Sequence, residues 1–150
     1  MLVEKVFDEV IYPDLKTFIE DDEIYFPKVT KVYPQDSKIF PIIPIRLLPV
    51  TNRYNNLNYG EETYTFGIEI DVFSTDKILD NNKVSKKSIC DELTKKIVEY
   101  IKENYHFTIK VTHDAPNVDS NVHRDVITLT GVLDTKYGEN NLVIYPRLNR

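Results

Sequence analysis

The sequence has little of several features that mark specialised classes of protein. Its one cysteine, Cys90, cannot form an internal disulfide, so the chain is not a disulfide scaffold. Four glycines in 150 residues are too few for a glycine-rich repeat, and no glycine loop of the kind that cradles phosphate is present. The most apolar run lies at 40–50, but Pro44, Arg46 and Pro49 interrupt it well short of the ~20 residues that a membrane-spanning helix needs.

The sequence also lacks an excess of basic residues, because 24 acidic residues outnumber 19 lysines and arginines. The formal net charge is −5, and the basic pairs at 86–87 and 95–96 stand among acidic neighbours. A sequence-independent grip on duplex DNA needs a basic face, so this balance argues against dedicated DNA binding. Near the N-terminus, Glu4 and Asp8 interrupt the apolar run that a secretory signal would require. We therefore expect a soluble, intracellular protein.

The chain is well supplied with residues that build a core. Hydrophobic residues make up 41% of it, and it contains ten Tyr and seven Phe. This composition is that of a folded globular protein. A chain of 150 residues suffices for one ordinary domain and is too short for two. We expect residues 1–150 to form a single domain.

Two segments have apolar residues at helical spacing. In the first, at 3–19, Pro13 removes a backbone donor and predicts a kink or a restart near Tyr12. The acidic residues at 20–23 end this helix. The second begins at the candidate N-cap Ser85 and reaches about residue 104, with an apolar stripe formed by Ile89, Leu93, Ile97 and Ile101. Cys90 lies on the flank of this stripe, where we expect a packed, inert thiol.

Alternating apolar residues predict the strands. The clearest strand is 63–74, and its apolar face should meet the stripe of the second helix through Tyr64, Phe66, Ile68, Ile70 and Val72. Prolines make 39–50 an edge strand with a bend, joined to 63–74 by a polar loop at 51–62. After a second loop at 74–84 and the helix, further strands follow at 107–111, 126–133 and 142–146. The elements predict an α+β fold, with a mainly antiparallel sheet of four to six strands and two helices packed on one face.

The strand at 63–74 also has two acidic residues on its polar face. Glu69 and Asp71 could hold Mg²⁺, but such sites need further oxygen ligands, and nucleases add a nearby lysine. The residue two positions after Glu69 is Asp71, where the common nuclease pattern has lysine. We favour a solvated sheet face over a metal site at these residues.

A second polar group surrounds the loop before the strand at 126–133. It consists of His113, Asp114, Asp119, His123 and Asp125, whose side chains are of the types that bind zinc or a harder ion. Their spacing matches no compact ligand motif, and Asp favours turns through local hydrogen bonds. We therefore favour turn capping, and we assign no catalytic, cofactor-binding or metal-binding residue and no cofactor.

The order of the elements resembles that of a known family. A first helix, a strand interrupted by prolines, "YTFGIEIDVFSTDK", the helix "SKKSICDELTKKIVEYIKENY" and then "FTIKVTHDAPNVDSNVHRDVITLTGVLD" are similar to the tail terminator, or tail completion, proteins of long-tailed bacteriophages. The resemblance covers most of residues 1–134 and rests on element order and on the junction of strand, "STD" and helix.

The resemblance implies a non-enzymatic structural protein of the virion. Such a subunit forms a hexameric ring at the head-proximal end of the tail tube, ends tube polymerisation and joins the tail to the neck proteins of the head. Assembly would take place in the host cytoplasm, without membrane contact. DNA would pass through the channel without specific binding, because an acidic lining repels it. Glu69 and Asp71 become candidates for a lumen or inter-subunit face, and the loops 51–62 and 74–84 for docking on tube or neck.

Two other functions remain open. One is a small metal-dependent nuclease or phosphoesterase that uses Glu69, Asp71 and the region from His113 to Asp125. The other is a monomeric adaptor module. The absence of a convergent catalytic set favours an assembly protein over the enzyme.

Overall fold

An N-terminal helical run packs along the sheet in the computed structural model, which describes residues 2–32, 39–56, 61–134 and 143–145. The run consists of α1 (Leu2–Val6), the π-helical segment η1 (Phe7–Ile11) and α2 (Tyr12–Glu20). The backbone N–H of Tyr12 bonds to the carbonyl of Phe7. This wider turn lies directly before Pro13, whose ring would crowd the preceding turn of a regular α-helix. The irregularity predicted near Tyr12 therefore takes the form of a π-helical turn.

The strands of the main sheet occupy five positions in the order β1, β2, β4, β8, β7. Their bounds are β1 Lys28–Thr30, β2 Ile42–Leu47, β3 Thr51–Asn56, β4 Glu61–Ser74, β7 Thr108–Thr112, β8 His123–Asp134 and β9 Val143–Tyr145. Both β2 and β3 pair with β4, one after the other along its length, and β7 and β9 pair with β8 in the same way. Each described pair is antiparallel except β1 with β2, so the α+β class and the mainly antiparallel sheet are confirmed.

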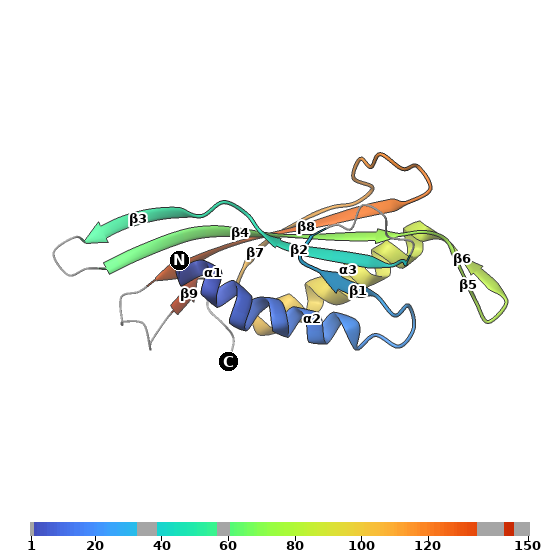
Figure 1. Cartoon of the computed structure of the whole chain (residues 1–150), viewed down its shortest axis with the longest axis horizontal. Coiled ribbons are helices and arrows are strands. Elements are labelled where there is room, and N and C mark those ends of the chain that lie inside the picture. The colour runs from blue at the N-terminus through green and yellow to red at the C-terminus, as the bar shows by residue number, and fades with distance from the viewer. Residues whose placement is uncertain (1, 33–38, 57–60, 135–142, 146–150) are drawn as a thin grey trace.

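Both segments predicted as long loops contain β-hairpins, so these two predictions were wrong. The polar segment 51–62 contributes β3 and the first residues of β4. The segment 74–84 contains β5 (Lys77–Leu79) and β6 (Asn82–Val84), which pair with each other. In Figure 1 the two hairpins lie at opposite ends of the molecule, beyond the helices. A strand that projects past the core buries little of either face, so it lacks the apolar alternation by which strands are recognised. In the β5–β6 hairpin, Leu79 and Val84 pack against the core.

The prediction of an edge strand at 39–50 was also wrong. Over Ile42 to Pro44, β2 has the parallel strand β1 on one side, in register from Lys28, and β4 on the other. Pairing with β1 stops at Pro44, which cannot donate a ladder hydrogen bond. The prolines thus predicted correctly that β2 is not paired on both sides along its whole length. They did not predict that its first residues, Ile42 to Pro44, lie between two strands.

The long helix α3 (Lys86–Asn104) crosses the same face of the sheet as the N-terminal run, as Figure 1 shows. Its N-cap is Ser85, as predicted, whose side chain accepts the N–H of Ser88 at 3.2 Å. The stripe of α3 and the apolar face of β4 are buried in one cluster, so their predicted contact is confirmed; its members include Ile89, Leu93, Ile97, Ile101, Phe66, Ile68, Ile70 and Val72. No helix in the described ranges is long and apolar enough to cross a membrane.

Side-chain contacts hold α2 against α3. The rings of Phe18 and Tyr100 stack with centroids 3.9 Å apart. The carboxylate of Asp14 on α2 accepts hydrogen bonds from the hydroxyls of Tyr100 at 2.6 Å and Tyr105 at 2.5 Å. Because phenols donating to a carboxylate are among the stronger hydrogen bonds, they fix α2 against the end of α3.

Side chains on β4 and β8 alternate between the helix-covered face and the opposite, open face. Val72 lies across from Asp125, and both side chains point toward the helices, where both are buried. Asp71 lies across from Val126 on the open face. The open face is capped at one end by a small apolar cluster of Ile42, Phe73 and Val122.

Candidate functional site

The first candidate site is the acidic pair on the open face of the sheet. Glu69 and Asp71 project from β4, and each meets an arginine on a neighbouring strand. Arg46 on β2 places Nε 3.0 Å and Nη2 2.8 Å from Glu69 Oε2. Arg124 on β8 places Nη2 3.4 Å from Asp71 Oδ2. The side chains of Glu69 and Asp71 are 16% and 14% exposed, whereas that of Arg46 is 59% exposed, so the carboxylates are covered and one of their two partners is not.

The ion pair with Arg124 does not fully offset the cost of burying the charge of Asp71. Burial raises its pKa to about 6; the nearby Glu69 adds to the rise, while Arg124 opposes it. Asp71 Oδ1 and Arg124 Nε are buried without a hydrogen-bond partner in the described part of the chain. Polar atoms left in this state cost free energy.

The flanking arginines bear on the magnesium hypothesis for this pair. A hard cation needs several oxygen ligands with little positive charge nearby. Here the guanidinium groups of Arg46 and Arg124 already contact the carboxylates. The arrangement disfavours a cation at Glu69 and Asp71 and suits an ion-pair network instead.

The second candidate site centres on a buried carboxylate at the start of β8. Asp125 is fully buried. Its Oδ1 accepts the backbone N–H of Asp114 at 3.0 Å and lies 3.0 Å from His123 Nε2. Its Oδ2 accepts the hydroxyl of Thr94 at 3.2 Å and lies 3.1 Å from His113 Nδ1. Four groups from α3, the strand ends and the loop between them thus converge on one side chain.

Asp91 on α3 completes this cluster. Its Oδ1 lies 3.2 Å from His113 Nδ1, so the imidazole contacts two carboxylates at once. The hydrogen bond with Asp125 raises the pKa of His113. Burial and the neighbouring Asp125 raise the pKa of Asp91. Burial alone would raise the pKa of Asp125, but the N–H of Asp114 and the surrounding side chains outweigh it, so this pKa lies below its ordinary value.

The structure brings together four of the five polar residues named from the sequence. His113, Asp114, His123 and Asp125 meet, with Asp114 Oδ1 3.6 Å from His123 Nδ1. Asp119 has a turn-capping contact instead, accepting the N–H of Asn121 at 2.9 Å. Turn capping, the interpretation favoured from the sequence, is therefore right for Asp119, while Asp125 anchors a buried cluster.

Sequence reasoning missed the residues that reach each site from other strands or from the helix. Arg46 and Arg124 lie on strands that flank β4, and only the register reveals that they face its acids. Asp91 and Thr94 lie three apart on α3, on the side that faces β8. Their spacing could have indicated this site from the sequence. Residues three apart lie on one face of a helix, and two polar residues beside the apolar stripe indicate a polar partner on the sheet.

The two candidate sites lie on opposite faces of the sheet. Asp71 pairs with Val126, and the next pair along the ladder is Val72 with Asp125. Because successive strand residues point to opposite faces, Asp71 and Asp125 are separated by the sheet itself. Glu69 and Asp71 therefore do not share one site with Asp125.

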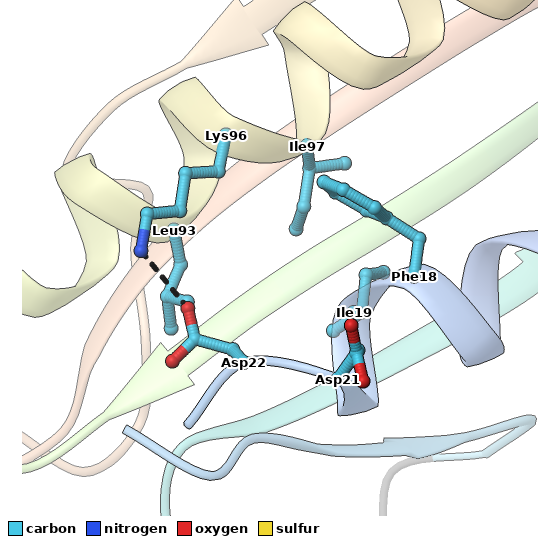
Figure 2. Close-up of a pocket in the computed structure, with 7 residues that line it drawn as sticks. All are labelled: Phe18, Ile19, Asp21, Asp22, Leu93, Lys96 and Ile97. Atoms are coloured by element: carbon cyan, nitrogen blue, oxygen red, sulfur yellow. Dashed lines mark hydrogen bonds and ion pairs between the residues drawn. The ribbon is translucent and has the colours of Figure 1, made fainter. Parts of the chain in front are cut away.

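A pocket of 160 Å³ lies between the end of α2 and α3 (Figure 2). The apolar side chains of Phe18, Ile19 and Leu93 line it, together with an ion pair between Lys96 Nζ and Asp22 Oδ2 at 3.0 Å. Burial would raise the pKa of Asp22, but the N–H of Tyr25 and the Lys96 ammonium hold it below its ordinary value. The pair joins the segment after α2 to α3.

Comparison with known proteins does not assign the chain to a family. No protein-family model matches the sequence, and no curated protein matches it either.

Proposed function

We propose that this chain is a tail terminator, a non-enzymatic structural subunit of a long-tailed bacteriophage virion. Its hexameric ring would sit at the head-proximal end of the tail tube, stop tube polymerisation and join the tail to a neck protein of the head. Its partners would be further copies of itself, the tail tube protein and the head-completion protein. DNA would pass through the ring without specific binding, in keeping with a net charge of −5.

The observation that supports this proposal most directly is the pair of hairpins. The β3–β4 and β5–β6 hairpins lie at opposite ends of the molecule (Figure 1). They occupy the segments 51–62 and 74–84, which the resemblance makes candidates for docking on the tube or the neck. A ring subunit between a tube and a neck needs contact surfaces that face in opposite directions, and heterologous contacts between identical subunits close into rings when the rotation permits.

The acidic pair on the open face supports an interface between subunits. Glu69 and Asp71 are mostly covered, and each is paired with an arginine. A carboxylate that repels DNA in a channel would be exposed and unneutralised, whereas covered arginine–carboxylate pairs are typical of protein contacts. Of the two roles expected for this pair, the inter-subunit face fits better than the lumen.

The experiment is to assay ring formation and tube capping by the purified chain. Native mass spectrometry and negative-stain images should show rings, at high concentration or when tail tubes assembled from the cognate tube protein are added. A protein that stays monomeric and never binds tubes would contradict the proposal and favour an adaptor. Metal-dependent cleavage of nucleic acid or phosphoesters that Glu69→Ala abolishes in a folded protein would favour the enzyme.

A matched pair of variants tests the hairpin directly. Ile78 on β5 has 76% of its surface exposed, and Val32, outside both hairpins, has 75% exposed. Ile78→Asp should reduce the fraction of capped tubes at least tenfold, because a charge is expensive to bury at a contact. Val32→Asp should leave capping unchanged. Equal capping by the two variants would show that the β5–β6 hairpin is not part of the docking surface.

A further inference from the structure

We propose that Asp91, His113 and Asp125 form a binding site for one divalent transition-metal ion of the zinc class. The site lies on the helix-covered side of the sheet, where α3 passes the ends of β7 and β8. It is separate from the acidic pair on the open face and does not depend on the proposed role in tail assembly.

The three side chains present their ligand atoms to a common point. One oxygen of each carboxylate and one ring nitrogen of His113 all lie within 4.8 Å of one another. His113 Nδ1 is 3.2 Å from Asp91 Oδ1 and 3.1 Å from Asp125 Oδ2. Ligands about 2.0–2.2 Å from a tetrahedral zinc ion are themselves about 3.3 Å apart. Small side-chain movements would therefore admit an ion.

The central ligand is already oriented by its surroundings. Asp125 is fully buried, and its Oδ1 is held by the N–H of Asp114 and by His123. Its Oδ2 accepts the hydroxyl of Thr94 and also faces the site. Asp114 has a φ of 53°, a conformation that non-glycine residues rarely adopt, and it aims this N–H at the carboxylate. Metal ligands are typically fixed by such outer contacts, and their loss lowers affinity about 10–100-fold. An acidic cluster on a solvated surface lacks this support.

Charge also favours an ion at this position. The only ion pairs of Asp125 with described residues are with His113 and His123; no lysine or arginine in those ranges reaches it. One carboxylate oxygen of Asp91 and one of Asp125 lie within 4.8 Å of each other, so two acids share one small space. A dication between them would neutralise both. Binding displaces the proton that His113 Nδ1 otherwise donates to the carboxylates; that proton leaves to solvent, and the neutral ring carries its single proton on Nε2.

The access and the ligand types indicate the class of ion. The side chains of His113 and Asp91 are 57% and 40% exposed, so an ion can enter from solvent and keep water in its remaining coordination position. One imidazole with two carboxylates suits Zn²⁺ or Co²⁺, whereas Mg²⁺ and Ca²⁺ prefer oxygen ligands alone.

The experiment is titration of the full chain with Zn²⁺ by calorimetry, with Co²⁺ as a spectroscopic probe. We expect one ion per chain, with visible Co²⁺ absorption from a site of mixed nitrogen and oxygen ligands. Asp91→Asn and His113→Ala should each weaken binding at least tenfold. Asp125→Asn is avoided as the main test because Asp125 is also a buried anchor of the fold.

The matched control is His106→Ala, because His106 is exposed and lies outside the cluster. It should leave the affinity and the Co²⁺ spectrum unchanged, and far-ultraviolet circular dichroism would verify the fold of each variant. Zn²⁺ binding of equal strength in His113→Ala and the unaltered protein would overturn the site. Loss of binding in His106→Ala would overturn it as well. Displacement of Zn²⁺ by an equal concentration of Mg²⁺ would overturn the assigned class of ion.

Discussion

Replacing Asp71 by asparagine should stabilise the protein at pH 8, although the substitution removes one partner of an ion pair. Burial raises the pKa of Asp71 to about 6, and Arg124, whose Nη2 is 3.4 Å away, does not compensate. The ionised carboxylate is thus less favourable in the folded chain than in water. Asparagine has nearly the same shape, carries no charge, and keeps an oxygen for the Arg124 side chain.

The size of the effect follows from the pKa. The difference between about 6 and the ordinary value of 3.8 corresponds to at most about 3 kcal/mol, at 1.36 kcal/mol for each pH unit. The folded-state pKa lies above the unfolded one, so the cost of the ionised group is fully present above pH 6. It declines as pH falls and disappears below about 4. We expect Asp71→Asn to raise the free energy of unfolding by about 2 kcal/mol at pH 8, and by almost nothing at pH 4.

Urea denaturation of both proteins at pH 8, 6.5, 5 and 4 measures this difference. The control is Asp8→Asn, because Asp8 and Lys31 form an exposed ion pair with both side chains 52% exposed. Such a pair contributes about 0–1 kcal/mol, so its loss should be small and destabilising. Destabilisation by Asp71→Asn at pH 8, or a gain that stays constant down to pH 4, would show that attraction to Arg124 outweighs burial.

Four further substitutions or measurements test the packing. Gly131→Ala should cost about 1–3 kcal/mol, because its Cβ would lie 2.6 Å from the Phe107 ring; Gly67→Ala should cost less, since the nearest atom is the movable tip of a leucine at 3.0 Å. Asp14→Ala removes the acceptor of two tyrosine hydroxyls and should lower the free energy of unfolding by about 2–3 kcal/mol in urea titrations. Cys90 is buried, and its burial raises the pKa of the thiol, so it should react with a disulfide reagent only at the rate of unfolding; fast reaction in the native state would contradict this packing.

The sequence predicted those elements that bury one face against another. The alternation at 63–74 and the stripe of α3 each demand an apolar partner, and the two meet in the core. The same reasoning missed β3, because a strand in a projecting hairpin obtains its stability from pairing with β4 rather than from burial. It also missed β1, which pairs over three residues only.

The candidate sites were less accessible to sequence reasoning than the core. Glu69 and Asp71 were identified correctly as neighbours on one polar face, but their arginines come from strands whose register no local pattern encodes. Asp125 was identified only as part of a polar loop. The cluster around it includes Asp91 and Thr94 on α3, which are distant in the sequence. Contacts between distant segments arise from the tertiary structure, and no local pattern predicts them.

The ladder between β4 and β8 has a consequence for the order of folding. It joins Ser74 to His123 at one end and Thr63 to Asp134 at the other, so the whole of α3 lies inside the loop that the ladder closes. Closing a long, unstructured loop is entropically costly and slows folding. A helix formed early would shorten that loop and present its apolar stripe to both strands. We therefore expect loss of the Ser85 cap to slow folding more than it speeds unfolding, placing α3 in the folding nucleus.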